Sequence, residues 1–261
     1  MLEIKDLTIQ YGDKPPVVEN FSLSLKKGEI ITIVGESGSG KSTVLSSILG
    51  LLPNGGKIIS GDIIYNGESM LSKSLNQWRE LRGTEITMIS QDSGGTLNPI
   101  RKIGKQFVEY IQTHSKMSAK EAEEKAKDMF SKVNLPDPEI IMKSYPHQLS
   151  GGMKQRVGIA MALTFHPKII LADEPTSALD VITQAQIVKE IMDLRKKFDT
   201  SIIMVTHNLG VAAYISDKII VMQNGKIVDA GNKNEVIENP KSEYTKKLLE
   251  AVPEIGGERL V

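Results

Sequence analysis

The chain has 261 residues, of which 25% are charged and 40% hydrophobic, a composition typical of a globular protein. Lys and Arg number 32 and Asp and Glu also 32, so the net charge is zero and no nucleic-acid partner is indicated. Cysteine is absent, which excludes a disulfide scaffold, a thiolate metal site, an iron–sulfur cluster and a cysteine nucleophile. Charges at Glu3, Lys5 and Asp6 predict no signal peptide, and no apolar run is long enough to predict a membrane span.

The N-terminal part predicts strands, a glycine loop and a helix in that order. Residues 2–10 are rich in β formers, and residues 21–25 alternate apolar and polar side chains, as in a half-exposed strand. Ile30 to Val34 is apolar except at Thr32, which is typical of a strand buried on both faces. A glycine-rich segment and a helix-like stretch from Lys41 to Leu49 follow. This succession predicts the start of a βαβ unit in an α/β fold.

Residues 35–42, between that strand and that helix, match the phosphate-binding pattern G-x-x-x-x-G-K-[ST]. Glycines let backbone N–H groups surround phosphates, and the helix N-terminus adds positive potential. Lys41 is expected to contact the β- and γ-phosphates and Ser42 to ligate Mg²⁺. The alternative, a merely flexible glycine loop, is disfavoured by the strand and helix on either side. The expected nucleotide-binding residues are Gly35, Glu36, Ser37, Gly38, Ser39, Gly40, Lys41, Ser42 and Thr43.

The middle of the chain predicts an inserted helical lobe, roughly residues 93–150. Ser118 to Leu135 has apolar residues at three- and four-residue spacing, and Ser118 with Glu121 forms a capping box. Two further buried strands are expected at Lys168 to Ala172 and Ser201 to Thr206, joined by a helix over about 183–198.

The last part of the chain predicts a hairpin and a helical tail. Residues 219–223 and 226–229 flank an Asn-Gly pair, which is typical of a tight β-turn. From about Asn234 the sequence is mostly helical and polar.

Acidic residues and a histidine follow the two later strands. Asp173 and Glu174 come directly after an apolar run, at the strand end where α/β sheets bind ligands. Asp173 is expected to hold Mg²⁺ through water, and Glu174 to activate the attacking water as general base. His207 follows the other strand and is expected to face the γ-phosphate.

The segment Leu149-Ser150-Gly151-Gly152-Met153 begins another predicted helix. Ser and two glycines at a helix start form a second anion site, which one chain does not need for one γ-phosphate. A head-to-tail dimer does need it, because each chain can then close the other's nucleotide site. This segment resembles the signature motif of the ATP-binding-cassette ATPases. Together with the phosphate loop it indicates a resemblance to that family, which covers nearly the whole chain.

The resemblance implies further roles. Tyr11 lies where the family stacks an aromatic ring on adenine, and Gln91 resembles the glutamine that touches Mg²⁺ and senses the γ-phosphate. His207 matches the family's switch histidine. The segment that resembles the family's D-loop, which crosses to the other subunit, is Ser177, Ala178, Leu179 and Asp180.

The resemblance implies a P-loop NTPase core with a mixed sheet flanked by helices, an antiparallel β subdomain and an inserted α-helical subdomain. We expect one cassette domain over residues 1–261. Residues 1–92 and 151–233 are its RecA-like core with the β subdomain, 93–150 its helical subdomain and 234–261 a C-terminal helical tail.

The chain resembles more closely the D-type ATPases of oligopeptide, dipeptide and nickel importers. This rests on residues 96–99 (Thr-Leu-Asn-Pro), 144–148 (Ser-Tyr-Pro-His-Gln), Met153 and 180–186. It implies ATP and Mg²⁺ as cofactors, a second ATPase subunit that is an F-type paralogue or another copy, two membrane permease subunits and, indirectly, an extracellular binding protein. The chain is expected at the cytoplasmic face of the membrane. Residues 93–95 (Ser-Gly-Gly) depart from the family pattern, which leaves the permease contact open.

Several functions stay open at this point. Short peptides are the first expectation for the cargo, and nickel or a metal chelate the second. A soluble cassette protein that acts in DNA repair or on the ribosome is disfavoured, because such proteins usually carry long coiled-coil insertions or two cassettes. A P-loop kinase or GTPase does not explain the segment 149–152. A non-hydrolysing regulatory subunit is disfavoured by Glu174 and His207, and a measurement of ATP turnover would distinguish it from an active ATPase.

Overall fold

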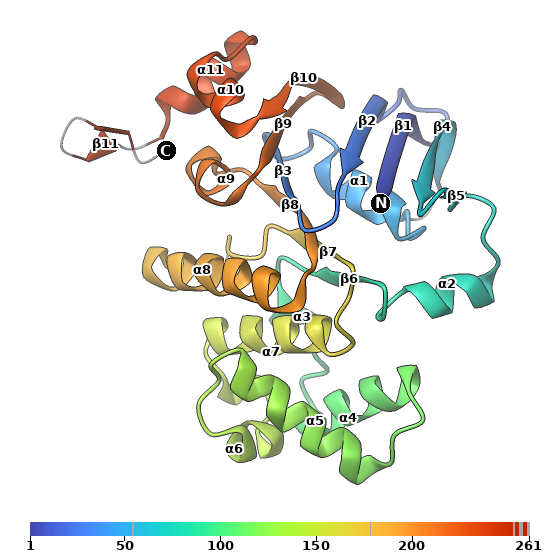
Figure 1. Ribbon diagram of the computed structural model, residues 1–261, viewed down its shortest axis with the longest axis vertical. Coiled ribbons are helices and arrows are strands. Elements are labelled where there is room, and N and C mark those ends of the chain that lie inside the picture. The colour runs from blue at the N-terminus through green and yellow to red at the C-terminus, as the bar shows by residue number, and fades with distance from the viewer. Residues whose placement is uncertain (54, 178, 253, 256–257, 260–261) are drawn as a thin grey trace. The chain divides into compact units, whose positions relative to one another are not determined.

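The structure is a computed structural model that describes residues 1–53, 55–177, 179–252, 254–255 and 258–259 (Figure 1). The chain forms two compact units. The first contains residues 1–78 and 201–261, and the second contains residues 79–200. The predicted division into a core, a lobe at 93–150 and a tail from 234 stays a prediction.

The first unit contains an antiparallel sheet in the order β2-β1-β4-β5. Its strands are β1 (Leu2–Tyr11), β2 (Val18–Leu25), β4 (Gly56–Tyr65) and β5 (Glu68–Ser69). The alternation predicted for residues 21–25 is confirmed, because Phe21, Leu23 and Leu25 are buried. Strand β4 is not predicted because Gly61 interrupts its period-two pattern. Gly61 has φ +85°, and a Cβ there would lie 2.4 Å from the carbonyl oxygen of Lys5.

A second set of strands in the first unit carries the phosphate loop. These are β3 (Ile30–Val34), β8 (Ser201–Thr206), β9 (Lys218–Gln223) and β10 (Lys226–Asn232). Strand β3 is parallel to both β8 and β9, and all five of its residues are buried, as predicted. The predicted hairpin is confirmed: β9 and β10 are antiparallel, and Asn224 and Gly225 have φ of 49° and 78°.

The helices of the first unit follow its strands in the chain. They are α1 (Lys41–Ile48), α9 (Leu209–Ile215), α10 (Lys233–Glu238) and α11 (Glu243–Glu250). Helix α2 (Leu75–Leu81) crosses the division between the units, and β11 (Glu254–Ile255) and β12 (Glu258–Arg259) form a short hairpin. Helix α1 begins at the predicted residue and buries Val44, Leu45 and Ile48.

The second unit has one parallel strand pair, β6 (Ile86–Ile89) and β7 (Ile169–Asp173). Its helices are α3 (Ser93–Thr96), α4 (Ile103–His114), α5 (Ala119–Lys132), α6 (Pro138–Lys143), the 3₁₀ helix η1 (Pro146–Gln148), α7 (Gly151–Leu163) and α8 (Val181–Phe198). The capping box of α5 is present as predicted. Phe107 of α4 packs on Phe130 of α5 with ring centroids 5.2 Å apart.

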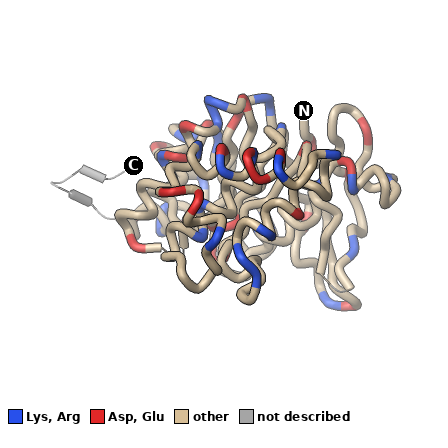
Figure 2. The backbone as a smooth tube through the Cα atoms, turned by 90° about the horizontal axis from the view of Figure 1, so that it is seen from below, with Lys and Arg blue, Asp and Glu red and all other residues tan. Residues whose placement is uncertain are grey.

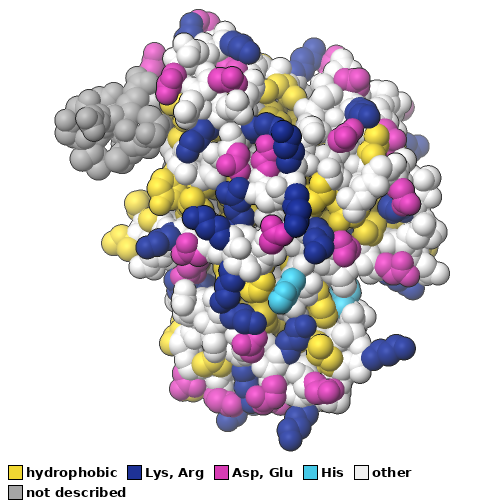
Figure 3. All heavy atoms as spheres, viewed as in Figure 1, with side chains coloured by type: hydrophobic (Ala, Val, Ile, Leu, Met, Phe, Trp, Pro, Cys, Tyr) yellow, Lys and Arg dark blue, Asp and Glu magenta, His cyan; other side chains and the backbone are white. Residues whose placement is uncertain are grey.

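Acidic and basic residues are interspersed along the chain (Figure 2). The face drawn in Figure 3 likewise carries both signs. Across the described ranges, no helix is both long enough and apolar enough to cross a membrane.

Candidate functional site

The phosphate loop, residues 35–42, leaves the end of β3 in the first unit. Gly35 is packed so closely that a Cβ there would lie 2.2 Å from the carbonyl oxygen of Met222. Gly38 and Gly40 have φ of 83° and 98°, a conformation that costs an ordinary side chain about 1–2 kcal/mol. A Cβ on Gly40 would also lie 2.8 Å from the carbonyl oxygen of Val17. The glycines predicted from the motif are therefore required by the backbone.

Lys41 is the first residue of α1 and is 5% exposed. Its Nζ donates hydrogen bonds to the carbonyl oxygens of Gly35 at 2.8 Å and Glu36 at 2.7 Å, and Ser39 Oγ lies 3.4 Å away. The ammonium group thus lies inside the loop. A phosphate bound there would compete with these carbonyls for the same charge.

The other residues of the loop differ in exposure. Glu36, Ser37 and Ser42 are exposed and Thr43 is half-buried, while Ser39 is buried. The β9–β10 turn supports the loop, because the N–H of Gly225 donates to the carbonyl oxygen of Ser39 at 3.2 Å.

Two further predicted residues lie in the first unit. Tyr11 ends β1, is half-buried, and has its Cε1 2.7 Å from where a Cβ on Gly56 would lie. His207 is exposed and follows Thr206, which pairs with Val34 in the parallel ladder. Gly35 and His207 therefore leave neighbouring parallel strands at the same edge, where α/β sheets bind ligands.

Gln91, Asp173 and Glu174 lie in the second unit at the ends of its two strands. Ile89 pairs with Ala172, so the chain leaves β6 and β7 at the same edge. Glu174 has φ 43°, a left-handed conformation that is uncommon for glutamate and frequent at functional sites. Its carbonyl oxygen accepts hydrogen bonds from the N–H and the Oγ of Ser177, each at 3.2 Å, which closes the turn.

The signature segment, residues 149–153, places its serine as the cap of a helix. Ser150 precedes α7, and its Oγ accepts a hydrogen bond from the N–H of Met153 at 3.3 Å. Leu149 is buried, whereas Ser150 and Gly151 are exposed and Gly152 is half-buried. A helix therefore begins at the predicted segment, with a serine as its cap.

The D-loop residues lie between β7 and α8. Asp180 caps α8 by accepting from the N–H of Thr183, and hydrogen bonds from Thr183 lower the pKa of the Asp180 carboxyl. Leu179 is half-buried and its Cδ2 lies 3.4 Å from where a Cβ on Gly151 would lie, so this D-loop residue lies beside the signature segment. Ala178 lies outside the described residues.

Helices α7 and α8 are joined by an ion pair. Arg156 of α7 donates from Nη2 to Oε1 of Glu190 at 2.8 Å and from Nε to Oε2 at 3.1 Å. The side chains are 17% and 14% exposed, so little solvent screens the pair. This two-pronged contact fixes the signature helix against the helix that follows the D-loop.

Contacts between the residues around Gln91 and helix α7, which the signature segment begins, are not predicted from the motifs. Buried Gln155 lies with its Nε2 3.5 Å from the carbonyl oxygen of Ser90, just before Gln91. A Cβ on Gly158 would lie 2.5 Å from Ser93 Oγ. A glycine in the middle of a helix was the available signal for this close packing. Asp92 caps α3, a single turn that contains the atypical residues 93–95.

The side chains that could ligate a metal suit an Mg²⁺ ion held mainly by nucleotide phosphates, and not an ion coordinated by protein ligands alone. Within the described part of the chain, no group of three or more His, Asp or Glu side chains is placed to hold a metal. Mg²⁺ is usually held by one or two carboxylates together with substrate phosphates. In the first unit a serine hydroxyl beside the phosphate loop suits such an ion, and in the second unit an aspartate at a strand end does.

Comparison with known proteins identifies the family. The model of the ABC transporter family matches residues 18–177. The oligopeptide transport ATP-binding protein OppD of Bacillus subtilis is 44% identical over 97% of this chain and 72% of its own length. The dipeptide transport ATP-binding protein DppD of Lactococcus lactis is 40% identical over 98% and 74% of the two chains. The metal-staphylopine import system ATP-binding protein CntD of Staphylococcus aureus is 42% identical over 95% and 92%.

Solved structures show the same fold. A dimeric bacterial ABC transporter cassette has a TM-score of 0.78 at 30% identity, covering 89% of this chain and 99% of that one. A dimeric post-hydrolysis cassette bound to ADP and phosphate has a TM-score of 0.77 at 29% identity over the same shares. The predicted P-loop fold, with its mixed sheet, flanking helices and antiparallel β subdomain, is confirmed, and the kinase and GTPase alternatives are wrong. The chain belongs to the ABC transporter family, as one of its ATP-binding cassette ATPases.

Proposed function

We propose that this chain is the ATP-hydrolysing subunit that drives an importer of short peptides. The observation that carries the proposal is the similarity, over nearly the whole chain, to proteins named for oligopeptide and dipeptide transport. The intact phosphate loop and the Asp173–Glu174 pair support hydrolysis, because a regulatory subunit without turnover would not need both.

The phosphate loop binds the nucleotide phosphates. Backbone N–H groups of the loop after Glu36 and the N-terminus of α1 bind the anion, and the Lys41 ammonium leaves its carbonyl partners for the β- and γ-phosphates. Tyr11 stacks on the adenine. Ser42, Asp173 and Gln91 would hold Mg²⁺, which supplies neutralising charge on the phosphates when bound.

Glu174 removes the proton from the attacking water. The water oxygen then forms a bond to the γ-phosphorus while the bond to the β-phosphate oxygen breaks, giving ADP and phosphate. The exposed imidazole of His207, at the same sheet edge as the loop, holds the γ-phosphate in place.

Each site is completed by a second subunit. The capped N-terminus of α7 supplies N–H groups to the nucleotide of a partner, a paralogue of this chain or another copy, and the D-loop crosses with it. ATP closes the pair and hydrolysis opens it. Two permease subunits take up this motion at the cytoplasmic face of the membrane, and an extracellular binding protein delivers the cargo.

Import of a metal chelate is the second candidate. The chain is 42% identical to the metal-staphylopine import protein over 95% of its residues, close to its 44% identity to the oligopeptide transport protein. The ATPase chemistry is the same in both candidates, and only the cargo differs.

The test is Glu174→Gln, which keeps the size and hydrogen-bonding capacity of the side chain but removes its basicity. We expect ATP affinity within about twofold of wild type and turnover reduced by about 10²-fold or more. Lys41→Ala is the control that loses binding. In source cells the variant should abolish uptake of labelled di- and oligopeptide and spare metal-chelate uptake. Wild-type turnover would overturn the general-base role, and loss of metal-chelate uptake alone would make this a metal importer.

A further inference from the structure

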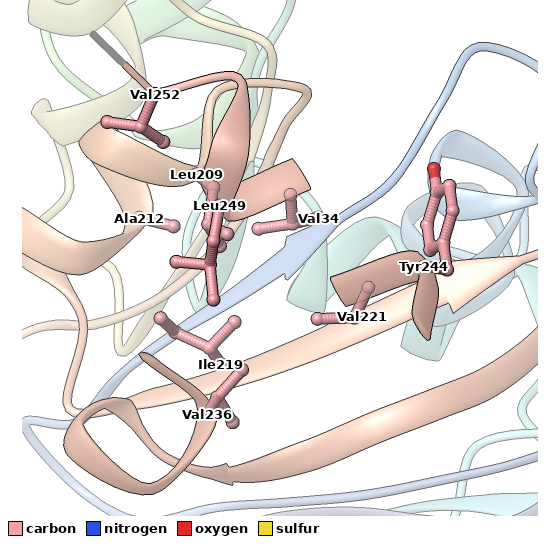
Figure 4. Close-up of a cluster of buried hydrophobic side chains, with 9 residues drawn as sticks. All are labelled: Val34, Leu209, Ala212, Ile219, Val221, Val236, Tyr244, Leu249 and Val252. Atoms are coloured by element: carbon pink, nitrogen blue, oxygen red, sulfur yellow. The ribbon is translucent and has the colours of Figure 1, made fainter. Parts of the chain in front are cut away.

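The C-terminal helix α11 packs against the strands that carry the phosphate loop. Tyr244 in its first turn is 9% exposed and belongs to a buried cluster with Val34, Val221 and Leu249. Figure 4 shows the Tyr244 ring beside Val221, with its hydroxyl directed away from the cluster. Val34 is the residue immediately before the phosphate loop, so the cluster lies under the start of that loop.

The Tyr244 hydroxyl makes a hydrogen bond to the phosphate loop itself. It accepts from the N–H of Glu36 at 2.9 Å. Burial raises the pKa of the Tyr244 phenol, so the group is neutral at physiological pH.

One peptide group is therefore held from both sides. The N–H of Glu36 and the C=O of Gly35 belong to the same planar peptide unit. The N–H donates to Tyr244, and the C=O accepts from Lys41 Nζ at 2.8 Å. Rotating this peptide would turn its N–H toward the Lys41 ammonium and take away one of the ammonium's two carbonyl acceptors, so the hydroxyl keeps the N–H directed away from the lysine.

Helix α11 is itself anchored before it reaches Tyr244. The buried carboxylate of Asp229 in β10 accepts hydrogen bonds from the N–H groups of Lys241 at 2.7 Å and Ser242 at 3.4 Å. Ser242 then caps the helix by accepting from the N–H of Thr245 at 3.0 Å. A helix tied at its start to a strand of the same unit is a rigid support for a side chain in its first turn.

We infer that Tyr244 is a positioning residue for ATP binding, through which the C-terminal helix sets the phosphate loop in its binding conformation. The inference rests on the proposed role of the loop in holding the nucleotide phosphates. Tyr244 does not touch the substrate; it acts through the Gly35–Glu36 peptide and Lys41. Losing its hydroxyl leaves the N–H of Glu36 without this partner and frees the peptide to rotate. The cost falls on nucleotide binding and not on the chemical step.

The test compares three variants of the full chain in the Glu174→Gln background, with ATP affinity measured by calorimetry and unfolding followed by urea titration. Tyr244→Phe removes the hydroxyl and keeps the ring. Leu249→Ala removes packing from the same cluster and keeps the hydroxyl. Tyr214→Phe removes an exposed phenol from α9.

We expect the Kd for ATP to rise about three- to tenfold in Tyr244→Phe, the effect of one lost hydrogen bond, and to stay within twofold in the other two variants. With Glu174 restored, KM should rise by the same factor and kcat stay within twofold, because only binding is affected. An unchanged Kd in Tyr244→Phe, or an equal rise in Leu249→Ala, would overturn the role of the hydroxyl. Wild-type ATP affinity in Lys41→Ala would instead overturn the phosphate loop as the binding site.

Discussion

Gly35 shows how a single residue decides whether the phosphate loop forms. Its Cα faces the carbonyl oxygen of Met222, and a Cβ would lie 2.2 Å away, far inside van der Waals contact. The contact is to backbone, so no side chain can rotate aside. Either the loop or β9 must shift to admit even one methyl group.

We expect Gly35→Ala to lower the free energy of unfolding by about 1–3 kcal/mol and to weaken ATP binding about tenfold or more, because the loop is displaced. Gly67→Ala is the matched control: Gly67 has φ +85° but nothing within 4 Å of a Cβ. It should cost about 1–2 kcal/mol of stability and leave ATP affinity unchanged. Urea unfolding and calorimetric ATP titration measure both. Equal loss of affinity in both variants would contradict the packing explanation.

Residues within a local motif are predictable, and residues that meet through the fold are not. The positions of Lys41 and the loop glycines follow from an eight-residue pattern with fixed spacing. The hydroxyl of Tyr244 reaches Glu36 from 208 residues further along the chain, and no pattern in either segment indicates the contact. The left-handed backbone of Glu174 is also hidden, because glutamate has no preference for it.

At the scale of elements, the ion pair between α7 and α8 joins the helix that the signature segment begins to the helix that follows the D-loop. Arg156 and Glu190 are both mostly buried and bonded at two points. Exposed pairs contribute little, but shielded charge-assisted hydrogen bonds are stronger.

A double-mutant cycle with Arg156→Met and Glu190→Gln should give a coupling free energy of about 1.5–3 kcal/mol in urea unfolding. The exposed pair Lys226–Glu19, with side chains 60% and 42% exposed, is the matched control and should show almost none. A coupling no larger than that of the control would mean that the two helices are held together by other contacts.

Elements were predictable where burial imposes a regular pattern. The strands at 30–34 and 201–206 are mostly apolar and buried throughout because both faces are covered. Helix α8 begins two residues before the predicted start, since Asp180 caps it and the first two helical residues are exposed although apolar: Val181 by 79% and Ile182 by 74%. An apolar residue on the surface cannot be recognised from hydrophobic periodicity, which assumes that apolar means buried.

At the scale of the whole molecule, the proposed nucleotide site is shared by two subunits. A substitution in the signature segment can therefore lower ATP turnover without affecting the folding of its own chain. Gly151 is exposed, and a Cβ there would make only ordinary contact, 3.4 Å from Leu179. A larger side chain at this position therefore fits its own chain but would meet the nucleotide held by a partner.

We expect Gly151→Asp to shift the thermal midpoint by less than about 2 °C and leave the ATP affinity of the isolated chain unchanged. Turnover of the assembled transporter should fall about tenfold or more, because a carboxylate opposes the γ-phosphate. Ser131→Asp on the exposed side of α5 is the control. Weakened ATP binding in the isolated chain would show that the signature acts within its own subunit.

The division of the chain also bears on the order in which it folds during synthesis. Residues 79–200 form the second unit as one uninterrupted stretch, whereas the first unit needs both ends of the chain. Within the described residues, the ladder partners of β3 are β8 and β9, which are made about 170 and about 190 residues later. While the ribosome translates the second unit, the five residues of β3, all apolar except Thr32, therefore remain without their partners. Stalled or truncated products that end before residue 201 should carry this strand exposed and be the aggregation-prone form of the chain.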